Sequence, residues 1–258
     1  MAISRRHPAA LLAVLVVALG TTGAAYAAVA AGTAPKVSAP SATQVTAGKQ
    51  LFLEGCSSCH GLAAQGSTDA PSLIGVGAAA VDFNVATGRM PMAGPGIQAP
   101  VKKVVYTPAE IAALAAYIAS LGPGPQIPTV EDVSTADADL ALGGELFRTN
   151  CAQCHSFSGR GGALSEGRWA PSLMKSSAKH IYEAMLSGPQ SMPVFSDNTM
   201  RPTDKRDIIR YIEELQKQED PGGYGLGRLG TVTEGLFIWV IGLGALLGVA
   251  VWIGAKSR

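Results

Sequence analysis

The sequence predicts an all-α protein: two small domains in tandem, followed by one C-terminal membrane helix. Three features indicate this arrangement: a repeated cysteine–histidine motif, a periodic apolar helix that closes each repeat, and a long uncharged segment near the C-terminus. Charged residues make up only 15% of the 258 residues, and the formal net charge is +1. Because nucleic-acid-binding proteins normally carry a basic stripe, no nucleic acid is expected as a partner.

Residues 1–31 predict an export signal or an N-terminal membrane anchor. Arg5 and Arg6 precede an apolar stretch, and Ala25-Tyr26-Ala27 resembles a small-x-small cleavage site. The apolar character resumes after this site, so the segment is also long enough to stay as an anchor. Either fate places the middle of the chain on the outer face of the cell membrane.

A second apolar segment, Leu236–Ile253, predicts a transmembrane helix. It holds no charged residue, and its roughly 18 residues cover most of a hydrocarbon core about 30 Å thick. Lys256 and Arg258 follow it, so the positive-inside rule puts the C-terminus in the cytoplasm. We assign 235–254 as the helix in the lipid bilayer and 255–258 as a cytoplasmic tail.

Three stretches rich in Gly, Pro, Ala or Ser separate the two domains from each other and from the membrane segments. Such compositions interrupt helices and bury little surface. Each domain is about 80 residues long, a size that usually needs a metal, a disulfide or a cofactor to supplement its apolar core. The predicted linkers are 32–43, 123–134 and 220–234, and the predicted domains are 44–122 and 135–219.

All four cysteines fall in two copies of one motif, CSSCH and CAQCH. Cysteines at i and i+3 can both form thioethers with one porphyrin, and the histidine that follows can bind the iron. The motifs therefore predict two covalently bound haem c groups. The predicted attachment residues are Cys56, Cys59, Cys151 and Cys154, and the predicted proximal ligands are His60 and His155.

Other uses of the cysteines are two disulfides, a thioredoxin-like redox pair, or a zinc site. Two of the four histidines complete the motifs, and neither half offers a further ligand pair at zinc-finger spacing, so haem attachment is favoured. His180 is expected on a helix surface or beside haem propionates rather than as a ligand. Five further residues could hold haem propionates or face a partner, but an ordinary surface position is favoured for each: Lys102, Lys103, Arg89, Arg168 and Trp169.

The two domains are repeats of one another beyond the motif. Gly48, with Leu-Phe after it, returns 95 residues later as Gly143. The tetrad Ala-Pro-Ser-Leu occurs at 70–73 and again at 170–173. Each repeat closes with a helix that has one apolar face, and the expected helix starts are Thr107-Pro108 and Thr203-Asp204.

This pattern resembles the class I cytochrome c fold. In that family a helix ending at C-x-x-C-H crosses the closing helix, with a glycine and an aromatic residue at the contact. The resemblance implies that Gly48 and Gly143 allow the close approach. It also implies that the carbonyls of Pro71 and Pro171 accept hydrogen bonds from the proximal histidines and so fix their ring orientation.

The same resemblance implies a methionine as the sixth iron ligand of each domain. Met90 and Met192 are each followed by proline, as is frequent in this family. Met92 is the rival in the first domain, and Met185 and Met200 are rivals in the second. A thioether ligand raises the potential and closes the iron, so electron transfer is implied and no catalytic residue is expected.

The whole layout resembles the di-haem cytochrome c subunit of the actinobacterial cytochrome bcc complex, a menaquinol–cytochrome c reductase and respiratory translocase. The resemblance implies a cytochrome b subunit, a Rieske iron–sulfur protein and a haem-copper oxidase supercomplex as partners. Electrons would pass from the Rieske protein through the first and then the second domain to the oxidase. Two alternatives stay open: a membrane-tethered di-haem shuttle outside that complex, and a di-haem oxidoreductase such as a peroxidase.

Overall fold

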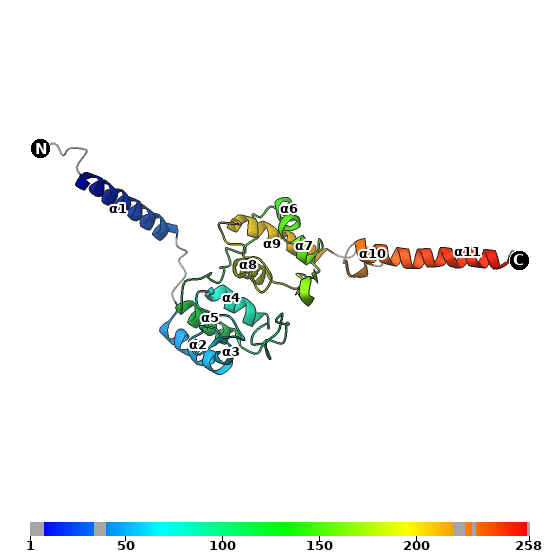
Figure 1. Cartoon of the computed structure of the whole chain (residues 1–258), viewed down its shortest axis with the longest axis horizontal. Helices are drawn as coiled ribbons and strands as arrows, with labels where there is room; N and C mark the ends of the chain where they lie inside the picture. Colours follow the sequence, from blue (N-terminus) through cyan, green and yellow to red (C-terminus); the bar gives the residue numbers. More distant parts are fainter. Residues whose placement is uncertain (1–7, 34–39, 219–224, 229–230, 257–258) are drawn as a thin grey trace. The chain divides into compact units, whose positions relative to one another are not determined.

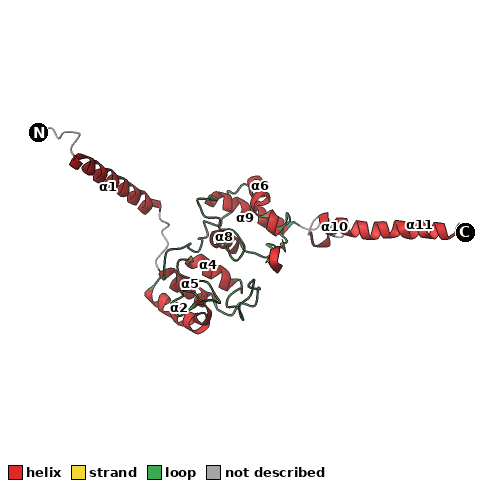
Figure 2. Cartoon of the chain, viewed as in Figure 1, coloured by secondary structure: helices red, strands yellow, loops and turns green. Residues whose placement is uncertain are grey.

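A computed structural model describes residues 8–33, 40–218, 225–228 and 231–256. The predicted Arg5-Arg6 pair, parts of the linkers 32–43 and 220–234, and Arg258 lie outside the described residues. Helices dominate what is described, as Figures 1 and 2 show, and the strands within it are two residues each. The prediction of an all-α fold is confirmed.

The first domain is built on α2 (Ala42–Gly55) and α5 (Pro108–Ser120), which pack together. Helix α5 begins where the sequence predicted. Thr107 accepts a hydrogen bond from the backbone N–H of Glu110, whose carboxylate accepts one from the backbone N–H of Thr107 at 2.7 Å. This reciprocal capping satisfies two backbone donors that the start of a helix would otherwise leave unpaired. The domain also contains α3 (Ser57–His60) and α4 (Gly77–Ala86).

The second domain repeats the arrangement with α6 (Leu140–Asn150) and α9 (Pro202–Lys217). The predicted start of α9 is late by one residue. Pro202 takes the first helical position, as Pro108 does in the first domain, because its fixed φ suits that place. The remaining elements of this domain are α7 (Ala152–His155), β1 (Gly162–Ala163), η1 (Ser165–Gly167), β2 (Trp169–Ala170) and α8 (Ala178–Ser187).

The helix crossings match the contact that the resemblance implied. A Cβ placed on Gly48 would collide with the carbonyl oxygen of Ala113, and one on Gly143 would collide with that of Asp207. Only glycine allows the helices to come this close. An aromatic pair flanks each crossing, Phe52 with Tyr117 at 5.4 Å between ring centroids and Phe147 with Tyr211 at 5.3 Å.

Part of the predicted linker 123–134 is packed onto the first domain, so the expectation that it buries little is wrong there. The carbonyl of Pro125 accepts a hydrogen bond of 3.1 Å from the backbone N–H of Ala79. Ile127 packs against the core of the first domain. Two glycines, Gly77 and Gly124, allow this approach because a side chain on either would meet the other segment.

The two domains meet where α4 of the first lies beside α8 of the second (Figure 1). This contact also carries an ion pair, in which Lys179 Nζ lies 2.7 Å from Asp82 Oδ2. Each domain keeps its own apolar core. Phe52, Leu114 and Ile118 are central to the first core, and Phe147, Ile209 and Ile212 to the second.

Two helices are long and apolar enough to cross a membrane. The first lies within α1 (Pro8–Thr33) and covers Ala9–Ala28, with a mean hydropathy of 2.0. A cleaved signal sequence and a retained membrane anchor both form such a helix, so both interpretations of residues 1–31 remain predictions.

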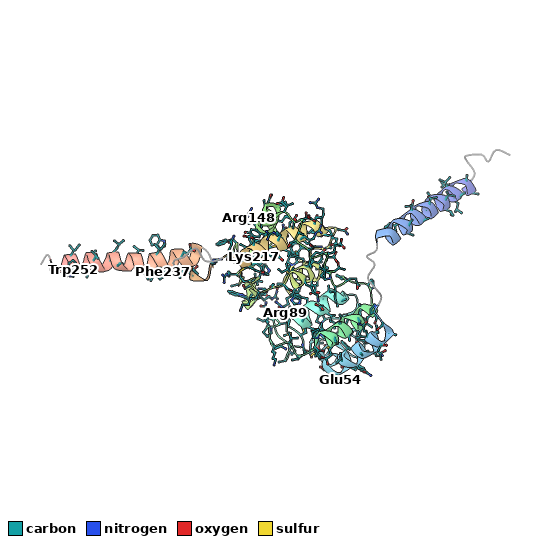
Figure 3. All side chains as sticks on the ribbon, turned by 180° about the vertical axis from the view of Figure 1, so that it is seen from behind. Glu54, Arg89, Arg148, Lys217, Phe237 and Trp252 are labelled. Atoms are coloured by element: carbon teal, nitrogen blue, oxygen red, sulfur yellow. The ribbon has the colours of Figure 1, made fainter. Side chains whose placement is uncertain are left out.

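The second covers Thr233–Lys256, with a mean hydropathy of 2.5, and agrees with the predicted helix 235–254. Its side chains face outward, and Figure 3 shows Phe237 and Trp252 doing so. It runs through α10 (Thr231–Ile238), the π-helical turn η3 (Trp239–Leu243) and α11 (Gly244–Lys256), after the short η2 (Leu226–Arg228).

Candidate functional site

The first cysteine–histidine motif follows directly on α2. Cys56 ends that helix, and α3 carries Cys59 and the buried His60. His60 Nδ1 lies 2.8 Å from the carbonyl oxygen of Pro71. Because a carbonyl oxygen can only accept a hydrogen bond, Nδ1 carries the hydrogen, and the Nε2 lone pair is free to bind a metal ion.

The second motif has the same geometry. His155 Nδ1 donates to the carbonyl oxygen of Pro171 at 2.9 Å. The pairing of β1 with β2 sets Gly162 opposite Ala170 and so fixes the chain next to Pro171. Burial lowers the pKa of His155, although the bond to Pro171 acts in the opposite direction. The imidazole is therefore neutral at neutral pH, as an iron ligand must be.

The four cysteines all lie in the described part of the chain, and none of them forms a disulfide. Burial raises the pKa of Cys151 to about 12, with a smaller contribution from Cys154. Burial likewise raises the pKa of Cys56, and Cys59 adds to the effect. All four thiols are therefore free in the described structure, as thioether attachment to a porphyrin requires.

A cavity of ≈ 740 Å³ adjoins the second motif. Its size lies within the range of roughly 300–1,000 Å³ typical of pockets for cofactors. Cys151, Cys154, His155 and Met192 all line it, so the structure brings the four predicted site residues of the second domain together. Other walls are apolar and include Leu173, Ile181, Ile208 and Ile212. This set of thiols, imidazole and thioether within apolar walls fits a haem c group.

Part of the wall of this cavity belongs to the first domain. Phe83 and Arg89 line it together with the segment 98–101, and Figure 3 labels Arg89 where the domains meet. The Arg89 guanidinium lies 4.7 Å from the centre of the Phe83 ring, and burial lowers its pKa. Trp169 lines the same cavity. Arg89 is half-buried, so the expectation that it is an ordinary surface residue is wrong, whereas Trp169 is exposed as expected and also borders the cavity.

The methionines differ in their surroundings. Met90 packs against the core of the first domain, as Cys56 and Leu73 also do. Met192 packs against the second core and lines its cavity, and Met185 lines that cavity too. Met200 is buried in the same core and is not among the described residues that line the cavity.

Sequence reasoning missed a buried group of titratable side chains at the contact of α4 and α8. Asp82 comes from α4, and His180 and Glu183 come from α8. His180 also lines the second cavity, and its expected place beside haem propionates stays a prediction. The only signal in the sequence is the single acid in the otherwise nearly apolar run GAAAVDFNVA.

The fold and the placement of the two motifs define a protein with two cytochrome c domains in tandem. A family model described as "Cytochrome c" matches residues 45–122. A second, described as "Cytochrome C oxidase, cbb3-type, subunit III", matches residues 138–212.

Curated relatives give the family more closely. The chain is 46% identical over 228 residues to the "Cytochrome bc1 complex cytochrome c subunit" of Corynebacterium efficiens. This match covers 83% of this chain and 77% of that protein. It is 48% identical over 216 residues to the protein of that name from Mycobacterium tuberculosis, a match that covers 81% of this chain and 77% of that protein. The protein from Corynebacterium diphtheriae is 45% identical over 225 residues, with 81% and 80% covered. The chain belongs to this family of cytochrome c subunits.

Proposed function

We propose that this chain is the electron-carrying subunit of a membrane-bound menaquinol–cytochrome c reductase. It would take electrons from a Rieske iron–sulfur protein and pass them to a haem-copper oxidase. The observation that best supports transfer within the chain is the shared cavity wall, because residues of the first domain line the cofactor cavity of the second. The relatives carry the name of a subunit of the cytochrome bc1 complex, which supports a role within such an assembly.

The eight predicted site residues have three different roles in binding haem. The two cysteines of each motif would hold the porphyrin covalently, and His60 and His155 would bind the iron through Nε2. The carbonyls of Pro71 and Pro171 orient the two imidazoles. Met90 and Met192 are proposed as the sixth ligands. When bound, the haem supplies an iron that takes up and releases one electron.

The first domain is proposed to accept electrons from the Rieske protein, and the second to deliver them to the oxidase. Holding both domains in one chain raises their effective concentration and removes a diffusional step between them. A soluble shuttle usually carries a charged face for steering, whereas this chain has a net charge of only +1. Its composition therefore suits permanent docking to a cytochrome b subunit and its partners.

We propose that Thr233–Lys256 spans the cell membrane with the C-terminus in the cytoplasm. The two domains would then stand on the outer face, where c-type haem is attached. Lys256 supports this orientation, because its ammonium lies 4.9 Å from the centre of the Trp252 ring at the C-terminal end of the helix. Cations favour the cytoplasmic side, and indole rings favour the interface.

The first test is the number of haem groups. The purified chain should carry two covalent haems by intact mass spectrometry, and Cys59→Ser and Cys154→Ser should each lose one. Ser58→Ala, inside the first motif, is the matched control and should keep both. A parent chain that carries a single haem, or none, would contradict the assignment of the motifs.

The second test is the assembly. Affinity purification of the full chain from solubilised membranes should recover a cytochrome b and a Rieske protein in stoichiometric amounts. If a chain with both haems is recovered without either partner, the protein is a tethered shuttle outside the reductase.

The third test is the order of the two domains. In a complex assembled with Cys154→Ser, quinol should still reduce the first domain quickly, while oxygen consumption stops. If quinol no longer reduces the remaining haem although the complex assembles, the order is reversed.

A further inference from the structure

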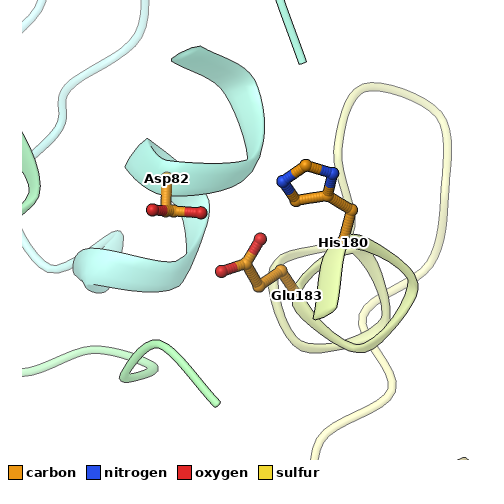
Figure 4. Close-up of side chains that lie close together, drawn as sticks. All are labelled: Asp82, His180 and Glu183. Atoms are coloured by element: carbon orange, nitrogen blue, oxygen red, sulfur yellow. The ribbon is translucent and has the colours of Figure 1, made fainter. Parts of the chain in front are cut away.

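The contact between the two domains contains a compact group of metal-binding side chains. Figure 4 shows the Glu183 carboxylate and the His180 ring, both from α8, turned toward Asp82 of α4. One ligand atom from each of the three lies within 4.8 Å of the others. His180 and Glu183 are three residues apart, so they share a face of their helix.

The two carboxylates are buried without enough partners. Glu183 is 0% exposed, and neither of its oxygens accepts a hydrogen bond from any described residue. The Asp82 side chain is 8% exposed, and its Oδ2 lies 2.7 Å from the ammonium of Lys179, which is not aligned for a hydrogen bond. Lys179 Nζ is 3.7 Å from Glu183 Oε1. One ammonium therefore serves two buried acids, and burying such groups unpaired is costly.

We propose that Asp82, His180 and Glu183 form a binding site for a divalent transition-metal ion, represented by Zn²⁺, that joins the two domains. Zinc bonds to imidazole nitrogen and carboxylate oxygen of about 2.0–2.2 Å would place neighbouring ligand atoms roughly 3.3–3.6 Å apart in a tetrahedral site. Since the ligand atoms lie within 4.8 Å of one another, the side chains would need to close by up to about 1.5 Å, which side-chain rotations provide. This site is separate from the two motifs and does not depend on the proposed function.

The mixed donor set selects among cations. Ca²⁺ and Mg²⁺ prefer sites made entirely of oxygen, whereas an imidazole with carboxylates suits Zn²⁺ and its first-row neighbours. Burial lowers the pKa of His180, and Lys179 and Arg89 act in the same direction while Asp82 opposes them. The ring is therefore neutral at neutral pH and has a free lone pair for a metal.

The ion would compete with a proton and with Lys179. Burial raises the pKa of Glu183 to about 9, and Asp82 adds to this effect while Lys179 opposes it. Glu183 is thus protonated at neutral pH without a metal, and binding must release that proton. The Lys179 side chain is 40% exposed, so it can turn into solvent and leave Asp82 to the ion.

Binding is tested on the full, haem-loaded chain in detergent after treatment with a chelator. Calorimetric titration with Zn²⁺, and metal analysis after dialysis, should find one ion per chain that excess Mg²⁺ does not displace. Glu183→Gln and Asp82→Asn should each weaken binding at least tenfold. Lys179→Met should strengthen it, because the competing ammonium is gone. Glu145→Gln, an exposed acid on α6, is the matched control and should bind as the parent does.

A metal site and a structural ion pair predict different results for Lys179→Met. In a metal site this variant binds Zn²⁺ more strongly, whereas the two acid variants bind it more weakly. If Lys179 only neutralises the acids, its removal destabilises the fold and leaves Zn²⁺ binding unchanged or absent. The proposal is overturned by a parent chain that binds no Zn²⁺, or by binding that Glu183→Gln leaves intact. Should Asp82→Asn fail to fold, as judged from its haem content, Glu183→Gln and Lys179→Met decide the matter.

Discussion

Gln98 of the first domain and Trp169 of the second exchange two hydrogen bonds. Gln98 Nε2 donates to the Trp169 carbonyl at 2.6 Å, and the Trp169 backbone N–H donates to Gln98 Oε1 at 2.7 Å. The side-chain amide thus pairs with β2 much as a neighbouring strand would. Both residues line the second cavity, so this pair holds the wall contributed by the first domain in place.

Replacing Gln98 should loosen the contact between the domains. Gln98→Leu removes two hydrogen bonds, each with a net contribution of about 0.5–1.5 kcal/mol, so local opening should become easier by roughly 1–3 kcal/mol. Hydrogen exchange followed by mass spectrometry should show faster exchange of the Trp169 amide. Gln126→Leu is the control, because that amide donates a hydrogen bond within its own segment, to the carbonyl of Gly124. Unchanged exchange at Trp169 would show that the pair contributes nothing to the contact.

The helix crossings should not tolerate a methyl group. Gly48→Ala and Gly143→Ala force a Cβ against a backbone carbonyl, and overpacking of this kind typically costs about 1–3 kcal/mol. Each variant should lower the free energy of unfolding of its own domain in denaturant titrations followed by absorbance. Gly94→Ala is the matched control, since nothing lies within 4 Å of its Cβ position. Equal stability of all three variants would refute the crossing as described.

Removing a proposed sixth ligand should open one iron. Met90→Ala and Met192→Ala should each lower the potential of one haem, within the roughly 0.8 V range that axial ligands control, and allow it to bind carbon monoxide. Met92→Leu and Met200→Leu are the controls and should leave both haems closed. If Met185→Leu opens the second haem and Met192→Ala does not, then Met185 of α8 is the sixth ligand of that haem.

The buried acid Glu183 should make stability depend on pH. Its pKa in the folded chain is about 9, above the ordinary value of 4.5, so the folded chain holds a proton that the unfolded chain loses. The stability linked to this proton is complete below about pH 4.5 and is lost as the pH rises toward 9. Glu183→Gln stays neutral, so the variant should gain in melting temperature relative to the parent across this window. The comparison uses metal-free protein, with Glu145→Gln as the control. A constant difference at every pH would contradict the raised pKa.

The parts of the molecule that the sequence predicted are those set by local or repeated patterns. The start of α5 could be located because Thr107, Pro108 and Glu110 form a cap within one turn. The histidine contacts with Pro71 and Pro171 followed from a repeat resembling a known fold. The predicted start of α9 is a residue late because Thr203-Asp204 is itself a common helix start, whereas the preceding Pro202 takes the first helical position.

The contact between the domains could not be predicted in the same way. It depends on residues far apart in the chain, such as Gln98 with Trp169, that follow no periodic pattern. Asp82 was overlooked because a lone acid in a helix is normally assumed to face water. The packing of Pro125 against Ala79 was missed because proline and glycine usually indicate a loose linker.

The shared wall of the second cavity changes how natural variation in this chain should be interpreted. Residues 98–101 belong to the first repeat by their position in the sequence, yet they border the site of the second. A substitution there should alter the spectrum of the second haem and leave that of the first unchanged. A survey of variants sorted by domain would assign such a change to the wrong electron carrier.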